Sequence, residues 1–422
     1  MLERYFIRQT TIDRIRASWM GVPIERYVNW LTEKGYAPRN VLIRVPLLMR
    51  FSEFARESGA AIWEELPNYV EPFVNTWLKK RGKSRATKES TKGAVRAISG
   101  PIHQVLRLII PGYSGGGRSP NFPDPFEVHT YGFFTYLRRE RGLRETTISQ
   151  YGHYLRCFEA YLQSIDLNSL SELSPTVLIS FINQRSQILK KRSIQGLCNV
   201  LKVFLRYLYL EGIVGRDLSP HIESPRRYSH AQIPRSISWD EVRRMLEVVD
   251  RRSRVGNRDY VILLLLVTYG LRSREVAALT LDDIDWRHNR LHIPERKSGH
   301  TTAYPLSSII GEAILDYLQH SRPKTSERAL FFRAIAPYTP MTYVAVSLRV
   351  KLYLRKARID IPRPGSHTLR HTCVQRLIDA QLSFKTIGDY VGHSSPDATK
   401  VYAKVSIEAL REVALGDGEL VV

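Results

Sequence analysis

The sequence contains few cysteines and no long apolar segment. Its 422 residues include three cysteines, Cys157, Cys198 and Cys373, which are widely spaced and form no C-x-x-C pair. An odd number of isolated thiols argues against a disulfide framework or a zinc site, and it fits a reducing, cytoplasmic compartment. The most apolar run, VILLLLV at 261–267, has seven residues, whereas a helix that crosses a membrane needs roughly 20. We therefore expect a buried core helix there and no membrane partner.

Acidic residues are also in short supply, and the N-terminus has no apolar leader. The opening stretch, MLERYFIRQTTIDRIRASWM, is charged throughout and lacks the apolar core of a signal peptide. Asp and Glu number 41 against 63 Lys and Arg, for a net charge of +22. This balance predicts a polyanionic partner, because Lys and Arg that neutralise phosphates release counterions. The alternative is a generally basic surface, as on ribosomal or heparin-binding proteins; a disordered basic tail is disfavoured because the charge is spread along the chain.

Two short segments rich in Gly, Pro and Ser divide the chain. The stretches PGYSGGGRSPNFPDP at 111–125 and RDLSPHIESPRRYSHAQIPRS at 216–236 are typical of linkers. The hydrophobic fraction of 43% is ample for packed cores on either side of them. We expect an N-terminal block, a second block, a third block and a tail: 1–110, 126–215, 237–415 and 416–422.

The first two blocks resemble each other. Setting Gly35 against Gly142 places Phe51 on Phe158. Further along, two triplets share their spacing: Ile98, Ile102 and Leu106, and Leu197, Leu201 and Leu205. Apolar residues at every fourth position mark one face of a helix. We expect each block to be a small helical domain and the first to be a diverged copy of the second, although any two amphipathic helical bundles can be aligned in this way.

The third block has a mixed pattern. Ser238 followed three residues later by Glu241 is a capping box that opens a helix, and the apolar helix is expected from Asp259 to Tyr269. The stretch NRLHIPERKSGHTTAYPLS predicts two strands around a Lys-Ser-Gly-His turn, because Gly299 supplies turn chemistry between alternating apolar residues. The predicted fold class is therefore mainly α, with helical N-terminal domains and a small antiparallel β-sheet in the C-terminal domain.

Charged side chains cluster after the apolar helix and near residue 370. In GLRSRE, Arg272 follows Gly270, where the helix is expected to end, and Glu275 lies three residues further on. Arg272 and Glu275 can therefore form an ion pair. Taken alone, this pair would be interpreted as a surface salt bridge. In SHTLRHT, three cationic or basic side chains share one helix face because they lie at i, i+3 and i+4: His367, Arg370 and His371. Such a face suits an anion. A metal site is the alternative, but an arginine between two ligands would oppose a cation.

Near the C-terminus, GHSSPDATKVY places a histidine and a tyrosine nine residues apart across a helix break. A helix is expected to end at Gly392 and another to begin at Ser395, since Pro396 suits the first turn of a helix. His393 then lies on the connecting turn and Tyr402 about two turns into the second helix. Tyr402 is either a packed aromatic residue or a nucleophile.

These segments, in this order, resemble the signatures of the tyrosine recombinases, also called the phage integrase family. GLRSRE resembles the first arginine motif, ERKSGHTTAYPL the lysine turn, HTLR the His-x-x-Arg motif, and GHSSPDATKVY the Gly-His followed nine residues later by Tyr. The resemblance is strong over 235–410. Residues 126–215 resemble the family's helical core-binding domain, and 1–110 is additional to its smallest members.

The resemblance implies an enzyme that cleaves and rejoins duplex DNA through a 3′-phosphotyrosyl intermediate, without metal, ATP or any other cofactor. It implies six catalytic residues: Arg272, Lys297, His367, Arg370, His393 and Tyr402. Tyr402 is the implied nucleophile with His367 as its base, the two arginines and His393 bind the phosphate, and Lys297 is the acid. Arg296 is a lesser candidate for the acid. Glu275 is expected to brace the arginines, and His371 to be structural.

The resemblance also implies partners. A specific double-stranded DNA site is expected, together with a tetramer on two such sites. In the family the C-terminal tail docks on a neighbouring subunit, and the tail here begins with an amphipathic pattern at Ile407, Leu410 and Val413. A bacterium or mobile element is the expected setting.

Three alternative functions fit the sequence less well than a tyrosine recombinase. A metal-dependent transposase would need three placed carboxylates, but Asp282, Asp283 and Asp285 are so close together that they suit a helix-to-strand turn. A type IB topoisomerase shares the chemistry, and the repeated N-terminal blocks favour a site-specific recombinase. A DNA-binding protein with a retired active site is disfavoured because all six residue types remain.

Overall fold

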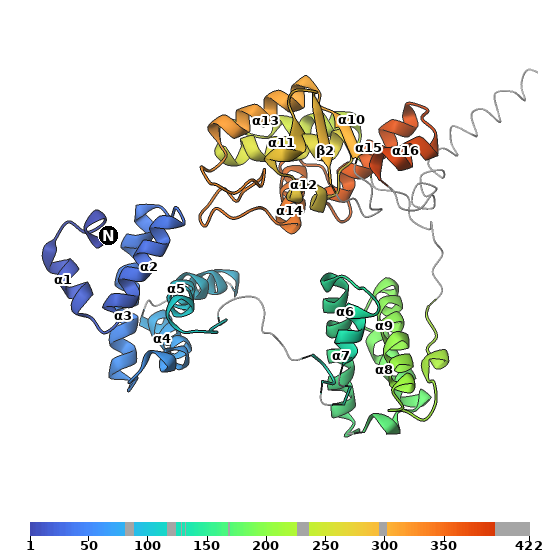
Figure 1. Ribbon diagram of the computed structural model, residues 1–422, viewed down its shortest axis with the longest axis horizontal. Coiled ribbons are helices and arrows are strands. Elements are labelled where there is room, and N and C mark those ends of the chain that lie inside the picture. Colours follow the sequence, from blue (N-terminus) through green and yellow to red (C-terminus); the bar gives the residue numbers. More distant parts are fainter. Residues whose placement is uncertain are drawn as a thin grey trace, which may run out of the picture. The chain divides into compact units, whose positions relative to one another are not determined.

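The computed structural model describes most of the chain as helices joined by short turns (Figure 1). The described residues are 1–80, 88–115, 124–127, 129–130, 132–167, 169–225, 236–294 and 302–392. The chain divides into two compact units, residues 117–231 and residues 1–116 together with 232–422. Within the described ranges, no helix is both long enough and apolar enough to cross a membrane.

The described part of the first 110 residues consists of helices joined by turns and short irregular segments. Their hydrophobic core is built from large side chains such as Tyr27 and Phe51, both fully buried. The helices are α1 (Gln9–Ala17), α2 (Gly21–Glu33), α3 (Pro38–Glu57), α4 (Leu66–Lys80) and α5 (Lys88–Ile109).

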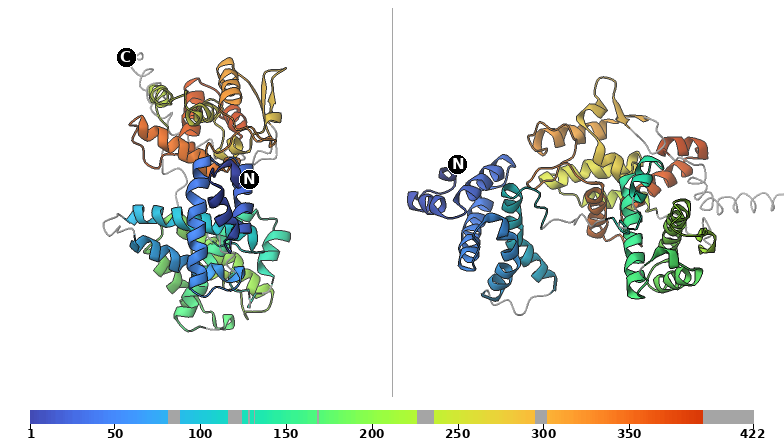
Figure 2. Two further views of the ribbon diagram at one scale, coloured as in Figure 1. Left: turned by 90° about the vertical axis from the view of Figure 1, so that its left-hand side faces the viewer. Right: turned by 60° about the horizontal axis from the view of Figure 1, so that its bottom comes forward.

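Residues 126–222 form a second helical core (Figures 1 and 2). Its helices are α6 (Phe133–Arg139), α7 (Glu145–Ser164), α8 (Pro175–Ser186) and α9 (Lys191–Leu210). The core extends into the segment expected to be a linker, because Leu218 and Ile222 are each only 1% exposed. A short 3₁₀ turn, Ser219–His221, packs these residues against α9.

The two helical blocks match each other residue by residue over their longest shared element. Helix α3 covers Pro38–Glu57 and α7 covers Glu145–Ser164, so both have twenty residues and are separated by a constant offset of 107. At all but three of the twenty paired positions, the two residues are both buried, both half-buried or both exposed. The same offset relates the 3₁₀ turns Trp63–Glu65 and Leu170–Glu172. Two unrelated bundles would not share helix bounds and burial at one offset, so these helices have the same local architecture.

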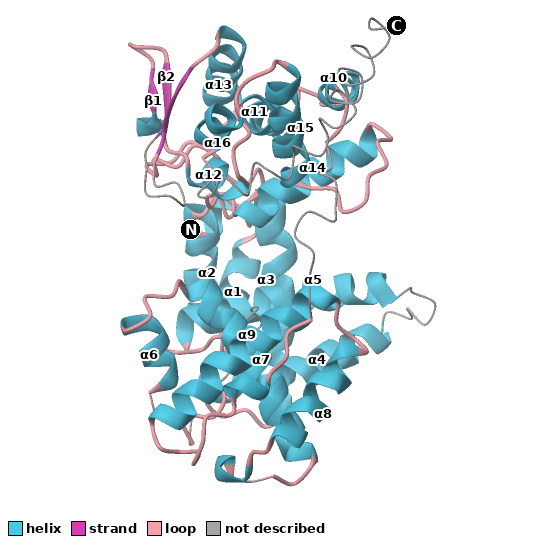
Figure 3. Cartoon of the chain, turned by 90° about the vertical axis from the view of Figure 1, so that its right-hand side faces the viewer, coloured by secondary structure: helices cyan, strands magenta, loops and turns pink. Residues whose placement is uncertain are grey.

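The third block contains seven helices and one three-stranded antiparallel sheet in its described part (Figure 3). The strand order is β1-β2-β3. The strands are β1 (Ile284–Asp285), β2 (Arg290–Ile293) and β3 (Thr302–Pro305). The helices are α10 (Trp239–Glu247), α11 (Arg254–Thr268), α12 (Ser273–Ala278), α13 (Ser308–His320), α14 (Tyr343–Lys356), α15 (Ser366–Asp379) and α16 (Phe384–Val391). The predicted fold class is therefore confirmed.

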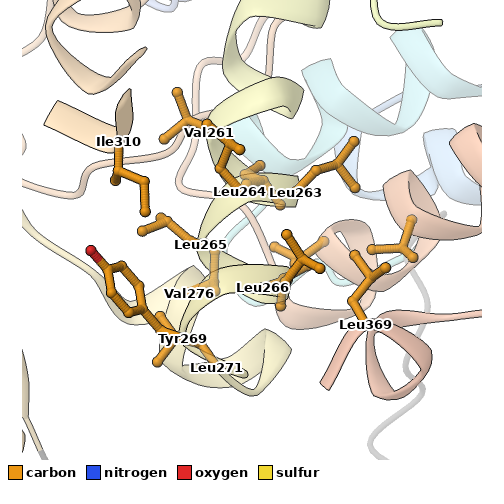
Figure 4. Close-up of a cluster of buried hydrophobic side chains, with 14 of the residues drawn as sticks. Val261, Leu263, Leu264, Leu265, Leu266, Tyr269, Leu271, Val276, Ile310 and Leu369 are labelled. Atoms are coloured by element: carbon orange, nitrogen blue, oxygen red, sulfur yellow. The ribbon is translucent and has the colours of Figure 1, made fainter. Parts of the chain in front are cut away.

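Helix α11 is the centre of this block. Its run from Val261 to Val267 is buried throughout, as predicted from its composition. Figure 4 shows Ile310 of α13 on one side of this helix and Leu369 of α15 on the other. A helix covered on both sides is held firmly, so the chain that leaves its C-terminal end has a fixed starting point.

The local predictions for the described part of this block hold, with two differences, and the helix expected to begin at Ser395 lies outside the described residues. Ser238 and Glu241 form the expected capping box, in which each side chain accepts the other residue's main-chain N–H. Helix α11 begins at Arg254, earlier than predicted, because the Ser253 hydroxyl caps it by accepting the N–H of Gly256. The third strand, β1, was not predicted; it has two residues and follows a 3₁₀ turn.

Candidate active site

Arg272 lies just beyond the end of α11. Gly270 ends that helix with a φ of 60°, in the left-handed region that glycine adopts without strain. Arg272 is then the N-cap of α12, and its main-chain N–H donates to Oε2 of Glu275 at 2.7 Å. The guanidinium Nη1 donates to Oε1 of the same carboxylate at 2.8 Å. The Glu275 side chain is 8% exposed, so this is a largely buried brace and not the surface salt bridge that the sequence alone would suggest.

Arg370 lies on α15 and is 4% exposed. Its Nη1 donates to the main-chain oxygen of Gly270 at 2.5 Å, and its Nη2 donates to that of Val391 at 2.6 Å. A buried guanidinium requires acceptors for its N–H groups. Here main-chain carbonyl groups from two distant segments provide them.

The end of α16 brings the two arginines together. Gly392 follows this helix in a left-handed conformation, with a φ of 66°, and its carbonyl oxygen accepts a hydrogen bond from Nη2 of Arg272 at 2.8 Å. The neighbouring Val391 carbonyl accepts from Arg370. Carbonyl groups at a helix C-terminus carry partial negative charge, which favours cations. Two positively charged forks therefore meet at the segment that directly precedes His393.

His367 lies one turn before Arg370 on α15, as the i, i+3 spacing predicted. Partial burial, followed by the nearby charges of Arg370 and Arg272, lowers the pKa of its imidazole below the usual value. A lowered pKa keeps the ring neutral at neutral pH, and a neutral imidazole can accept a proton. The ring centroid of His371 lies 6.4 Å away.

Three of the six expected site residues lie outside the described residues: Lys297, His393 and Tyr402. The segments next to them are placed, however. Strands β2 and β3 pair up to Ile293 and Thr302, so the chain leaves and re-enters the sheet at one point around the turn expected to carry Lys297. The two strands predicted on either side of that turn are therefore confirmed.

The carboxylates considered for a metal-dependent site are engaged elsewhere. Asp282 pairs with Arg328, Asp283 accepts from the main-chain N–H and hydroxyl of Thr280, and Asp285 pairs with His288. These bonds shape the helix-to-strand turn that the sequence predicted. The described part of the chain holds no cluster of three or more His, Cys, Asp or Glu side chains arranged to bind a metal ion.

Sequence reasoning located the arginines but missed what holds them. The acceptors are carbonyl oxygens of Gly270, Val391 and Gly392. Every residue has such a group, so no pattern of side chains marks it. The only indirect signal in the sequence is the pair of glycines, Gly270 and Gly392, that follow helix ends at these points.

Known proteins resemble this chain over most of its length. Residues 235–408 match the phage integrase family, and residues 131–212 match the phage integrase N-terminal SAM-like domain. The chain is 27% identical over 414 residues to the putative integrase/recombinase y4rA of Sinorhizobium fredii (strain NBRC 101917 / NGR234), covering 98% of each. It is 38% identical over 186 residues to y4gC, a putative integrase/recombinase of the same strain, covering 43% of this chain and 95% of that one.

Solved structures share the fold. The XerH site-specific recombinase in a post-cleavage complex with palindromic difH matches with a TM-score of 0.55 and 18% identity, over 66% of this chain and 82% of that one. A lambda integrase tetramer on a Holliday junction matches with a TM-score of 0.50 and 17% identity, over 71% and 84%. The chain belongs to the phage integrase family, the tyrosine recombinases. It is a site-specific DNA recombinase, an enzyme that cleaves and religates DNA strands.

Proposed function

We propose that Tyr402 carries the reaction and that Arg272, Lys297, His367, Arg370 and His393 assist it. The observation that supports this assignment is the convergence of Arg272 and Arg370 on residues 391 and 392. Two planar forks in one place suit the non-bridging oxygens of one phosphodiester. The transition state has extra negative charge on those oxygens. Stabilisation of that charge by fixed cations is usually the largest single contribution to lowering its energy.

The proposed reaction exchanges one phosphoester bond for another. The Tyr402 oxygen bonds to phosphorus while the bond from phosphorus to the 5′-oxygen breaks, which leaves a 3′-phosphotyrosyl link. A free tyrosine has a pKa of about 10, so a neutral His367 takes its proton. His393 donates a hydrogen bond to the phosphate. Attack by a 5′-hydroxyl of the partner strand on the phosphotyrosyl link reverses the step and releases Tyr402. Because one phosphoester bond replaces another in each step, the reaction needs no ATP.

The departing 5′-oxygen needs a proton, and Lys297 is the proposed source. Its turn connects β2 and β3, whose pairing is fixed on either side. Arg296 is the lesser candidate, because an arginine keeps its proton at any ordinary pH. Glu275 acts as a positioning residue, since it bonds to both the main chain and the guanidinium of Arg272.

We propose that the chain acts as three blocks joined by linkers, 1–110, 126–222 and 237–415, with the second block extended to include the buried Leu218 and Ile222. The second and third blocks would clamp duplex DNA from two sides. The first block would bind DNA as well, because its helix α3 matches α7 of the second block and it holds 19 Lys and Arg against 10 Asp and Glu. A basic domain of this kind favours a phosphate backbone.

The proposed assembly is a tetramer on two DNA sites, with the C-terminal segment 406–422, which includes the last part of the third block and the tail, docked on a neighbouring subunit. The lambda integrase tetramer on a Holliday junction has a similar fold and supports the tetramer. The three cysteines are free, which suits a reducing cytoplasm. A mobile element is the proposed setting, with integration or transposition as the outcome.

Substitution of the nucleophile tests the proposal. Tyr402→Phe should bind a duplex that carries the site as the unaltered chain does, but it should form no covalent adduct on a nicked suicide substrate, measured by gel electrophoresis. Tyr209→Phe is the matched control, because Tyr209 is 45% exposed on α9 and should be dispensable. Adduct formation by Tyr402→Phe would refute the assignment.

A further inference from the structure

Three tyrosines form a connected group among the segments that hold the two arginines. Tyr269 follows α11, Tyr304 lies on β3 and Tyr390 on α16. The ring centroids of Tyr269 and Tyr304 are 4.8 Å apart, and those of Tyr304 and Tyr390 are 5.0 Å apart in an edge-to-face arrangement. Tyr304, in the middle, is 2% exposed. None of these tyrosines belongs to the proposed catalytic set.

Hydrogen bonds join this group to three main-chain segments. The hydroxyl of Tyr304 donates to the carbonyl oxygen of Tyr390. The hydroxyl of Tyr390 donates to the carbonyl oxygen of Thr268, the last residue of α11, at 3.1 Å. The hydroxyl of Tyr269 donates to the carbonyl oxygen of Pro305 on β3 at 2.7 Å. The sheet, α11 and the end of α16 are thereby tied to one another.

The carbonyl that Tyr304 holds is next to the carbonyls that hold the arginines. Tyr390 is followed by Val391 and Gly392, which accept from Arg370 and Arg272. Adjacent peptide units are rigid planes joined by two soft dihedral angles, so fixing the Tyr390 carbonyl restricts the two that follow. The other acceptor of Arg370, the Gly270 carbonyl, lies two residues beyond Thr268.

We propose that Tyr304 is a positioning residue for cleavage, which acts through its hydroxyl on the end of α16 and thereby on Arg272 and Arg370. The inference rests on the proposed function of those two arginines and adds a residue outside the six. The competing account is that Tyr304 only fills the core with its ring. The two accounts differ for Tyr304→Phe, which keeps the ring and removes the hydroxyl.

The matched control is Tyr317→Phe. Tyr317 is 1% exposed in the same hydrophobic core, and its hydroxyl accepts a hydrogen bond from the main-chain N–H of Phe332 at 3.4 Å. It lies on α13 and has no hydrogen bond to the segments that hold the arginines among the described contacts. Both variants therefore lose one buried hydroxyl, and only one of them loses a tie to α16.

The measurement is single-turnover cleavage of a nicked suicide substrate by the full-length chain, with DNA affinity and Tm measured alongside. Tyr304→Phe should cleave about tenfold to a hundredfold more slowly than Tyr317→Phe, since small misplacements of binding groups cost rates of this order. DNA affinity and Tm should be alike in the two variants. The loss should persist on a 5′-phosphorothiolate substrate, because the arginines act on the non-bridging oxygens and not on the leaving group.

Two results would overturn the inference. One is cleavage by Tyr304→Phe as fast as by Tyr317→Phe. The other is recovery of the Tyr304→Phe cleavage rate on the phosphorothiolate substrate, which would show that the hydroxyl acts on protonation of the leaving group. If Tyr304→Phe is clearly less stable than its control, the two variants are compared at temperatures equally far below their Tm values. Equal cleavage rates under these conditions would refute the proposal. Adduct formation by the unaltered chain and its loss in Tyr402→Phe test the proposed function separately.

Discussion

Arg272 shows how a single residue can be fixed from several directions. Its main-chain N–H and its Nη1 donate to the two oxygens of Glu275, and its Nη2 donates to Gly392. The Arg272 side chain is nevertheless 24% exposed. Its guanidinium is therefore accessible to a phosphate while its orientation is set by the protein.

We predict that Arg272→Lys lowers cleavage by about 10²–10³-fold, because a lysine keeps the charge and loses the fork, and the loss of one electrostatic donor typically costs this much. The affinity for duplex DNA should fall little. Single-turnover cleavage and a binding titration on one suicide substrate measure the two effects.

Arg243→Lys is the control for this prediction. Arg243 also pairs with a carboxylate three residues away, Asp240, but its side chain is 65% exposed, and surface pairs of this kind contribute little. Near-normal cleavage by Arg272→Lys would show that Arg272 is a structural residue only.

At this scale the sequence predicted which side chains matter because their types and spacings are specific. His367 and Arg370 could be placed on one helix face from their positions alone. Their surroundings could not be foreseen. Arg370 is buried because residues 270 and 391 come from distant parts of the chain to accept its hydrogen bonds, and spacing along a sequence contains no information on such pairings.

Among the elements, the β2–β3 pair flanks the segment that contains the proposed general acid. Its strands pair from Arg290 with Pro305 to Ile293 with Thr302. The sequence between them contains two neighbouring cationic residues, Arg296 and Lys297. One of them is the proposed acid.

We predict that Lys297→Ala is rescued by a 5′-phosphorothiolate substrate, because a thiolate leaves without a proton. Arg370→Ala should not be rescued, since it removes phosphate binding instead. The measurement compares cleavage rates on oxygen and sulfur substrates for each variant. Rescue of Arg296→Ala in place of Lys297→Ala would move the acid to the neighbouring residue.

Helix ends were predictable where glycine or a capping serine marks them. Gly270, Gly392 and Ser238 all lie at the expected boundaries. Strand β1 was missed because two residues are too few to show an alternating pattern. The segment from 216 was read as a linker from its prolines and charges, yet Leu218 and Ile222 are buried. Two apolar residues in a polar stretch are a weak signal, and only the packing against α9 shows their role.

At the scale of the whole molecule, helices α3 and α7 have the same length. This match relates the additional N-terminal block to the second block. Equal length, nearly equal burial and one offset give these two helices the same local architecture. The relative y4rA is matched over 98% of its length, so a chain with this whole arrangement is not peculiar to the present sequence.

We predict that a shortened chain beginning at Asn121 still forms the phosphotyrosyl adduct on a core site, because every proposed catalytic residue lies after 235. It should bind long DNA more weakly and with a shallower salt dependence, since each lost phosphate contact removes about 0.9 from the log–log slope. Binding titrations at several salt concentrations, on both chains, measure the slopes.

Equal slopes for the two chains would mean that residues 1–110 do not touch DNA, and the block would then be assigned to assembly between proteins. Loss of adduct formation by the shortened chain would contradict the proposed boundary between the first two blocks.

The carbonyl groups that hold the two arginines have a practical consequence for mutagenesis. Alanine at Val391 changes a fully buried side chain and leaves the carbonyl in place, so it tests core packing and not the hydrogen bond that this carbonyl accepts. The acceptors at Val391 and Gly392 depend on the path of the main chain. They respond to a one-residue insertion or deletion in α16, or to loss of the left-handed turn at Gly392. The main chain of this segment is therefore tested by shifting it along the sequence, because replacement of a side chain leaves the acceptor atoms themselves in place.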